Sequence, residues 1–170
     1  AIMTLRLILT RHAKSSWGDP TAADFDRKLN NRGQQAATDI GAWLAERGYL
    51  PQQVLCSTAM RTRQTWERMA QHLPEPKALH FVPELYHAEP AVILALLRQA
   101  EEPVVALIGH NPGIGEFAQR IVSDPPVHRD FGRYPTGATL IVDFEEDRWK
   151  DIAPRSGRTV DFVTPRDLER

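Results

Sequence analysis

The sequence predicts an α/β protein whose central sheet is mostly parallel. Apolar runs alternate along the chain with segments that repeat apolar residues at helical spacing, and this alternation is typical of βαβ units. Three of the apolar runs, 5–10, 54–56 and 104–108, are followed closely by basic residues suited to binding phosphate. If these runs are neighbouring parallel strands, the basic residues meet at one edge of the sheet, where open α/β sheets bind ligands.

Two helices are predicted in the first half of the chain. The segment 34–47 repeats apolar residues at helical spacing, and Gly48 follows it as a common stop signal. A second helix is expected over 57–72, after the second apolar run, with Ser57 or Thr58 as its N-terminal cap.

The third apolar run leads into another helix, for which Asn111 is the expected cap and Pro112 the expected first residue. The remaining predicted elements are strands at 78–82, 138–144 and 160–163, a helix at 91–99, a strand at 149–153 that would pair with 138–144, and loops at 15–27 and 123–135.

Composition indicates one globular domain over 1–170. The chain is 42% hydrophobic and 25% charged, with a formal net charge of -1, so neither a nucleic-acid nor a membrane partner is expected. The single cysteine, Cys56, excludes an internal disulfide framework and favours a cytoplasmic location. Ala1 and Ile2 precede Met3 and are left out of the fold prediction as a remnant outside the domain.

Arg11 and His12 directly follow the first predicted strand. A strand end is a rigid platform for a residue that must attack in line. Near pH 7 an ordinary imidazole is largely neutral, and neighbouring arginines disfavour its cationic form further. A neutral imidazole can attack phosphorus and later leave it, so His12 is a candidate nucleophile for a two-step phosphoryl transfer.

Two further basic residues occupy equivalent places after the other strands. Arg61 falls in the first turn of its predicted helix, and arginine suits bidentate contact with phosphate. Arg63 lies about 200° away on the helical wheel and is interpreted as a packing or surface residue. His110 stands just before a helix start, where free amides and the helix dipole favour anions.

The sequence lacks the patterns that are typical of several other types of catalytic site. The six histidines do not form a His-Glu-x-x-His or other recognised metal-ligand spacing. There is no Gly-x-Ser-x-Gly elbow of a serine hydrolase and no Walker-type glycine loop. We therefore expect neither a metal nor nucleotide-driven chemistry.

Together these motifs resemble the histidine phosphatase (phosphoglycerate mutase-like) superfamily, and in particular its small bacterial SixA-type phosphohistidine phosphatases. Arg11-His12-Ala13 is similar to the family's Arg-His-Gly signature, with alanine in the third place. The other similar segments are 57–61 with 63–65 for the second arginine motif, 109–113 for the second histidine motif, and 26–33 for the arginine-leucine-glycine segment of SixA-type proteins.

The resemblance implies a three-layer α/β/α fold in which His12 accepts the phosphoryl group. It implies that Arg11, Arg61 and His110 form the phosphate pocket, and that Arg27 adds a substrate contact. No metal or organic cofactor is implied.

The resemblance also implies a carboxylic acid near the leaving group. Glu84, which follows the predicted strand 78–82, is the first candidate for this general acid. Asp24 and Asp26 on the first loop are alternatives that spacing does not separate from it.

The sequence is therefore interpreted as a phosphatase that forms a covalent phosphohistidine on His12 and acts on phosphohistidine carried by a protein. A small-molecule phosphomonoester hydrolase is the alternative among enzymes. A non-catalytic module that binds phosphate or a phosphoprotein is the alternative from another class. The expected partner is a phosphorylated protein or a small phosphorylated substrate.

Overall fold

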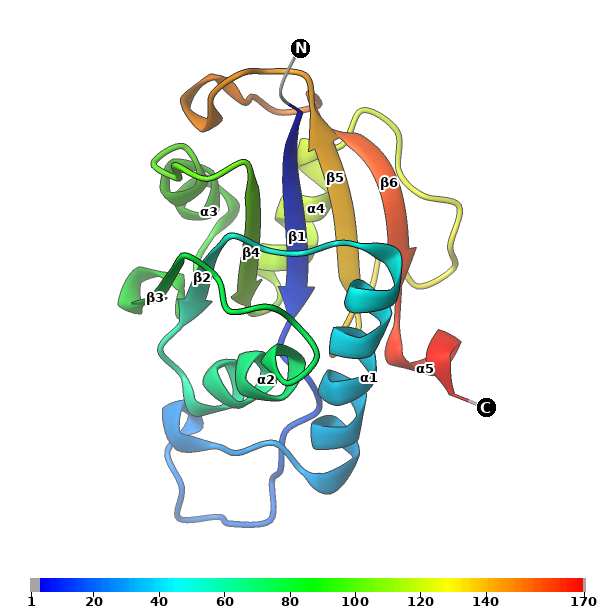
Figure 1. Cartoon of the computed structure of the whole chain (residues 1–170). Helices are drawn as coiled ribbons and strands as arrows, with labels where there is room; N and C mark the ends of the chain where they lie inside the picture. Colours follow the sequence, from blue (N-terminus) through cyan, green and yellow to red (C-terminus); the bar gives the residue numbers. More distant parts are fainter. Residues whose placement is uncertain (1–3, 170) are drawn as a thin grey trace.

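A computed structural model describes residues 4–169 and shows one six-stranded sheet in the order β3-β2-β4-β1-β5-β6 (Figure 1). Strands β3, β2, β4 and β1 run parallel, β5 runs antiparallel to β1, and β6 antiparallel to β5. Their bounds are β1 (Leu5–Arg11), β2 (Gln53–Ser57), β3 (Ala78–Val82), β4 (Val104–Gly109), β5 (Thr139–Phe144) and β6 (Arg158–Val163). The mostly parallel sheet predicted from the sequence is confirmed. Ala1 and Ile2 lie outside the described residues.

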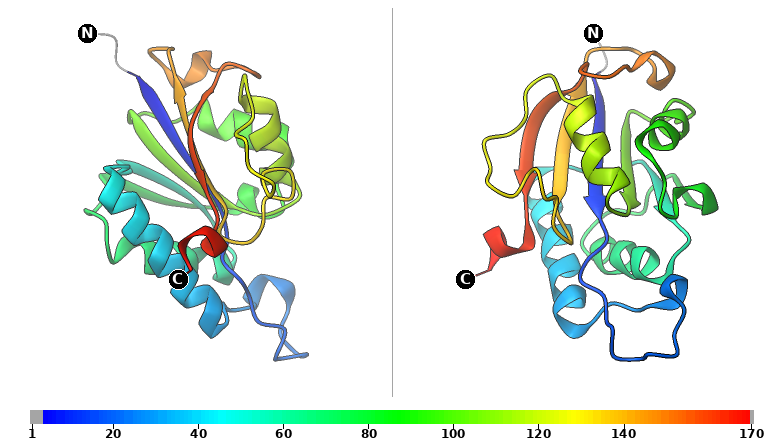
Figure 2. Two further views of the ribbon diagram at one scale, coloured as in Figure 1. Left: turned by 90° about the vertical axis from the view of Figure 1, so that its right-hand side faces the viewer. Right: turned by 180° about the vertical axis from the view of Figure 1, so that it is seen from behind.

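Helices cover both faces of this sheet and give the three-layer α/β/α arrangement (Figure 2). Helices α1 (Asn31–Arg47) and α2 (Met60–Ala70) pack on one face, and α3 (Pro90–Leu97) and α4 (Gly113–Ile121) pack on the other. The short α5 (Pro165–Leu168) lies beside α1. No helix within residues 4–169 is long and apolar enough to cross a membrane.

Alternation along β1 explains why both faces need helices. Leu7 and Leu9 point into the core shared with α3 and α4, whereas Ile8 between them points into the core shared with α1 and α2. All three are fully buried, and each contributes about 1.5–3 kcal/mol through burial. A strand that is apolar on both faces is typical of a parallel sheet with helices on each side.

The start of α1 is fixed against the segment that follows β1. The side chain of Asn30 caps the helix by accepting a hydrogen bond from the Gly33 amide at 2.7 Å. A β-carbon added at Gly33 would stand 2.0 Å from the carbonyl oxygen of Lys14. Glycine is therefore required for this close approach, which holds the chain just beyond His12 against the helix.

The predicted caps of two helices differ in detail from the observed ones. Helix α2 has Ala59 as its cap, and no side chain caps it; Ser57 instead accepts a hydrogen bond from the Ala59 amide at 3.3 Å. Helix α4 begins at Gly113, so Pro112 precedes it. Asn111 still serves this end of the helix, because its side-chain oxygen accepts from the Gly115 amide at 3.1 Å.

The strand predicted at 149–153 is wrong. Residues Trp149–Asp151 form a 3-10 turn, and β5 pairs instead with the later strand β6. The reason is that the Trp149 ring is buried against Phe144 and its indole N–H donates to the Glu102 carbonyl at 2.6 Å. Anchoring one aromatic ring in the core draws this segment away from the sheet. The loop predicted at 15–27 holds a further 3-10 turn, Asp24–Asp26.

Candidate active site

The carboxyl ends of β1, β2 and β4 bring their basic residues to one place. Strand β4 pairs with both β1 and β2, and its register sets Arg11 beside Gly109. The His12 amide donates to the Gly109 carbonyl at 3.0 Å, and the rings of His12 and His110 lie 5.5 Å apart. The next amide, that of Ala13, donates to Thr65 on α2 at 2.9 Å. The main chain at His12 and Ala13 is thus fixed by hydrogen bonds to both β4 and α2.

His12 is a buried, neutral imidazole with one free nitrogen. Its Nδ1 lies 2.7 Å from the carbonyl oxygen of Ala13. A carbonyl only accepts, so Nδ1 carries the proton and Nε2 keeps its lone pair. Burial, together with the charges of Arg11 and Arg61, lowers the pKa of His12 to about 3. Such a side chain is a competent nucleophile near neutral pH.

Three buried polar atoms around His12 have no hydrogen-bond partner: Nε of Arg11, Nε of Arg61 and Nδ1 of His110. Only one other such atom occurs among the side chains of residues 4–169. Buried polar groups nearly always have partners. Convergent nitrogen donors of this kind are what the oxygens of a phosphoryl group satisfy.

His110 is set up to donate from Nδ1. Its Nε2 lies 2.8 Å from the hydroxyl of Ser57. Burial lowers the pKa of His110 to about 2, and the neighbouring His12 and Arg61 act in the same direction, so the ring is neutral. When the Ser57 hydroxyl donates to Nε2, the ring proton stays on Nδ1 and faces the pocket.

The two pocket arginines are held by main-chain oxygens. Arg11 donates to the Tyr134 carbonyl at 3.2 Å, and burial lowers its pKa, as does the charge of Arg61. Arg61 is 1% exposed and donates to the Asp24 carbonyl at 2.7 Å. These contacts orient both guanidinium groups while leaving Nε of each unpartnered.

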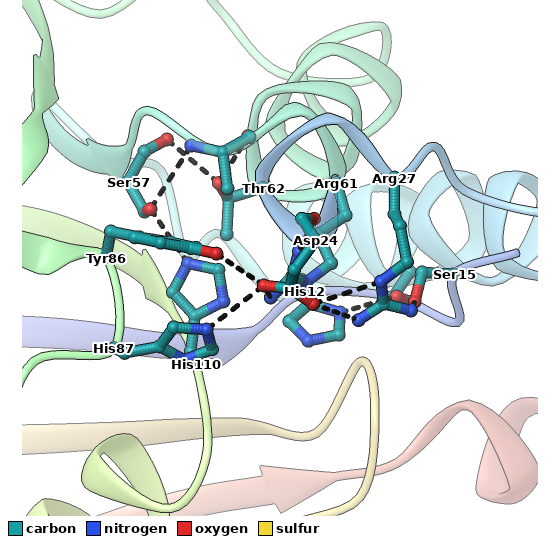
Figure 3. A network of polar contacts seen from close by, with 12 residues as sticks. His12, Ser15, Asp24, Arg27, Ser57, Arg61, Thr62, Tyr86, His87 and His110 are labelled. Carbon is teal, nitrogen blue, oxygen red and sulfur yellow. Dashed lines mark hydrogen bonds and ion pairs between the residues drawn. The ribbon is translucent and has the colours of Figure 1, made fainter. Parts of the chain in front are cut away.

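The carboxylate of Asp24 lies at the mouth of the pocket, at the centre of the network in Figure 3. It pairs with Arg61 at 3.1 Å and Arg27 at 2.9 Å, accepts from the Tyr86 hydroxyl, and lies 3.1 Å from Nε2 of His87. Partial burial raises the pKa of Asp24, but the hydrogen bonds from these neighbours and the charge of Arg61 outweigh it. The pKa of Asp24 is therefore well below its usual range.

Arg27 lies at the rim of the same pocket. Besides Asp24, its guanidinium contacts the Ser15 hydroxyl at 2.7 Å and stacks over the exposed ring of Trp17 at 3.6 Å. Its charge also contributes to the low pKa of His12. This position suits the substrate contact expected of Arg27.

Comparison with known proteins identifies the family. Residues 7–86 match the model of the histidine phosphatase superfamily, branch 1. An uncharacterised protein of Mycobacterium leprae is 30% identical over 165 residues, which cover 92% of this chain and 99% of that protein. The chain belongs to the histidine phosphatase superfamily. It is accordingly a histidine-type phosphatase.

Solved structures place this histidine phosphatase among SixA-like members. The proposed phosphohistidine phosphatase SixA from Agrobacterium tumefaciens is 30% identical, with a TM-score of 0.78 over 95% of this chain and 98% of that one. Its counterpart from Nakamurella multipartitia is 28% identical, with a TM-score of 0.80 over 95% of this chain and 96% of that one. The phosphoglycerate mutase-like fold predicted from the motifs is confirmed.

Glu84, the first candidate for a general acid, is not brought to the pocket of this histidine phosphatase. It lies in a 3-10 turn (Pro83–Leu85) that buries Leu85 in the core and turns Glu84 outward. There it lines a separate hollow with Lys77 and His80. Asp26 is exposed on the turn that carries Asp24, so of the three candidates it is Asp24 that reaches the pocket.

Sequence reasoning missed Tyr86 and His87. Both follow β3 by a few residues, so they lie at the same sheet edge as the other pocket residues. That placement was the available signal. The search for a carboxylic acid points to Glu84 in this segment and gives no reason to choose the two aromatic rings after it.

The low pKa values predict how the stability of this histidine phosphatase depends on pH. The folded-state pKa is about 3 for His12 and about 2 for His110, against an ordinary 6.5. Between these values the unfolded chain binds protons that the folded chain does not, so stability falls as pH drops below 6.5. Each histidine contributes a slope of about 1.4 kcal/mol per pH unit.

Denaturant unfolding at pH 5 and pH 7.5 measures this slope. The double variant His12→Asn/His110→Asn should show a distinctly smaller loss of unfolding free energy at pH 5 than the wild type. An equal loss in both proteins would show that these histidines are not neutral in the folded state.

Proposed function

We propose that this histidine phosphatase removes phosphoryl groups from phosphohistidine on a protein, by way of a covalent phosphohistidine on His12. The observation that carries the proposal is the free Nε2 of a buried neutral His12, set among the unpartnered donors of Arg11, Arg61 and His110. A nucleophile within a group of anion-binding donors is the arrangement that phosphoryl transfer requires.

In the first step, Nε2 of His12 forms a bond to phosphorus as the bond to the leaving group breaks. Arg11 and Arg61 hold the non-bridging oxygens, and Nδ1 of His110 donates to one of them, so the charge that develops there is stabilised. In the second step, a water oxygen attacks phosphorus, the bond to Nε2 breaks, and inorganic phosphate is released.

Three observations favour a protein-borne phosphohistidine as substrate. The solved relatives described above are proposed phosphohistidine phosphatases. The site is accessible to solvent at Asp24 and His87, whose side chains are 41% and 49% exposed. The low pKa of Asp24 leaves it ionised, so this carboxyl group does not protonate a leaving group, and an imidazole leaving group depends least on a carboxylic acid.

The two alternative functions make different demands on the site. A phosphate-binding module needs the donors but has no use for a free lone pair on His12. A small-molecule phosphomonoester hydrolase needs the same nucleophile, and it must also protonate an alkoxide leaving group. Substrate preference therefore separates the proposal from the second alternative.

The test is turnover of a histidine-phosphorylated protein in parallel with a panel of sugar, amino-acid and aryl phosphates, with His12→Asn as the blank. We expect kcat/KM for the phosphohistidine protein to exceed that for the best phosphomonoester at least about tenfold, or about 1.4 kcal/mol in barrier. A metabolite phosphate that is turned over faster than the phosphohistidine protein would overturn the substrate assignment.

Exhaustive chelation is expected to leave turnover unchanged. The proposed mechanism draws its nucleophile from His12 and its charge stabilisation from Arg11 and Arg61, so it requires no metal. The check is activity after treatment with a strong chelator, followed by separate addition of zinc and manganese. Loss of activity with specific recovery on adding either metal would refute this expectation.

A further inference from the structure

One carboxylate oxygen of Asp24 contacts both an arginine of the phosphate pocket and two side chains outside it. Its Oδ2 lies 3.1 Å from Nη2 of Arg61, a guanidinium that lines the phosphate pocket. The same atom lies 3.1 Å from Nε2 of His87 and accepts from the Tyr86 hydroxyl. An anionic oxygen bound at this point is thus within hydrogen-bond distance of a third imidazole, which the two-step reaction above does not use.

We infer that His87 is the proton donor to the leaving group. When a phosphoryl group displaces the Asp24 carboxylate from Arg61, the bridging oxygen of the substrate takes the place of Oδ2 and faces Nε2 of His87. The inference rests on the proposed chemistry at His12 and deepens it, because it assigns the proton that an oxygen leaving group needs.

The backbone and its packing also help to hold His87 in this position. His87 has a φ of 52°, in the left-handed region that is uncommon for residues other than glycine and is often found at functional sites. Its ring lies 4.3 Å from that of Tyr86 and 5.0 Å from that of His110. The following carbonyl, that of Ala88, fills the space where a β-carbon of Gly113 would stand.

The other titratable groups around His87 are less suited to give up a proton. Asp24 is ionised, because its pKa lies well below the usual range. Burial raises the pKa of the Tyr86 hydroxyl, as does its hydrogen bond to Asp24, so that group retains its proton. His110 is neutral, and its unpartnered Nδ1 is assigned above to a non-bridging oxygen of the phosphoryl group. Imidazole is the side-chain group best suited to carry a transferable proton near neutral pH, and the ring of His87 is half-exposed to solvent.

Protons and bonds balance over both steps. As Nε2 of His12 bonds to phosphorus and the bridging P–O bond breaks, the proton on Nε2 of His87 passes to the departing oxygen, so the first product leaves as an alcohol or phenol. His87 is then neutral. When water attacks the phosphohistidine, His87 accepts a proton from that water, phosphate departs, and the imidazolium is restored.

A proton donor at this point extends the substrate range. Phosphohistidine needs little protonation of its leaving group, whereas a phosphomonoester of a weakly acidic alcohol needs a great deal. The pocket is therefore suited to hydrolyse oxygen esters as well as phosphohistidine, and the reactivity toward esters depends on His87.

The test is single-turnover phosphorylation of His12 by a series of aryl phosphates whose phenols range from strongly to weakly acidic. His87→Asn is the main variant, since asparagine tolerates a left-handed backbone but cannot act as a general acid. We expect the rate of His12 phosphorylation in the variant to fall less than about tenfold for the ester of the most acidic phenol. For the ester of the least acidic phenol, the rate should fall at least about 100-fold. Addition of free imidazole should restore part of the rate for the latter.

A matched control is available in a second histidine–aspartate pair outside the pocket. Nε2 of His128 lies 2.8 Å from Asp167, so His128→Asn removes a similar pair and should leave the entire series unchanged. Equal losses across the series in His87→Asn, or no loss at all, would overturn the inference. Absence of phosphorylation of His12 in the wild type by any donor would instead refute the proposed function itself.

Discussion

Replacing His12 with alanine is expected to lower turnover of every substrate by at least about 10,000-fold, a typical cost of removing a covalent nucleophile. The reason is that the free Nε2 of His12, which lies among the donors of Arg11, Arg61 and His110, is the atom that bonds to phosphorus in the proposed reaction. Steady-state assays with a phosphohistidine protein and with an aryl phosphate, in the presence of a chelator, measure the loss.

The His12→Ala protein should still fold and bind phosphate. His12 lies at the end of β1, and its ring makes one hydrogen bond, to the adjacent carbonyl, so truncation leaves the apolar core intact. Calorimetric titration with inorganic phosphate should show retained binding, since the arginines and His110 remain. Residual turnover within about 100-fold of the wild type would contradict covalent catalysis by His12.

Replacing Arg61 with methionine is expected to reduce kcat/KM by about 100- to 1,000-fold, the usual effect of deleting one group that stabilises developing charge. Arg61 is 1% exposed, and its guanidinium holds the mouth of the pocket through Asp24. Arg63→Met is the matched control. It lies two residues away on α2, is exposed, and stacks over Phe81 at 4.2 Å, so its loss should leave kcat/KM nearly unchanged.

Although Arg61→Met should lower kcat/KM, it should not lower the stability of the fold. A buried charge with an unpartnered Nε beside a second guanidinium is costly to the folded state. Its ion-pair partner Asp24 is 41% exposed and is readily hydrated when released. Arg61→Met should therefore unfold at the same temperature as the wild type or a higher one. A clearly lower melting temperature would show that Arg61 supports the fold rather than the phosphate pocket.

The parts of the site that lie at strand ends were predictable from the sequence. Arg11, His12 and His110 follow apolar runs that are too regular to be read as anything but strands, and parallel pairing necessarily brings such ends together. The register of β1 with β4 then sets the two histidine motifs side by side. Local patterns suffice here because the strands themselves place the side chains.

The role of the loops was not predictable in the same way. Asp24 reaches Arg61 only because the segment after β1 folds back across the sheet edge, and that path depends on contacts such as the close approach of Gly33 to Lys14. The choice between Glu84 and His87 likewise depends on one 3-10 turn, which points the first outward and allows the second to reach Asp24. Only two residues separate them in the sequence, and spacing alone does not reveal the turn.

Trp149 shows the same limit for secondary structure. The segment follows a polar turn after β5 and is predicted to pair with that strand, yet the burial of one indole ring against Phe144 makes it a 3-10 turn. Tertiary packing overrides a short local pattern, as is common for elements of a few residues.

The central claim is that His12 becomes phosphorylated, and trapping the phosphorylated protein tests it most directly. Rapid mixing with excess substrate, quenching in alkali and digestion should yield one peptide that contains His12 and carries a single phosphoryl group, stable in base and lost in acid. The same treatment of His12→Asn should give no phosphorylated peptide. A phosphoryl group on another residue, or full turnover with no trapped phosphoprotein at any quench time, would contradict the account.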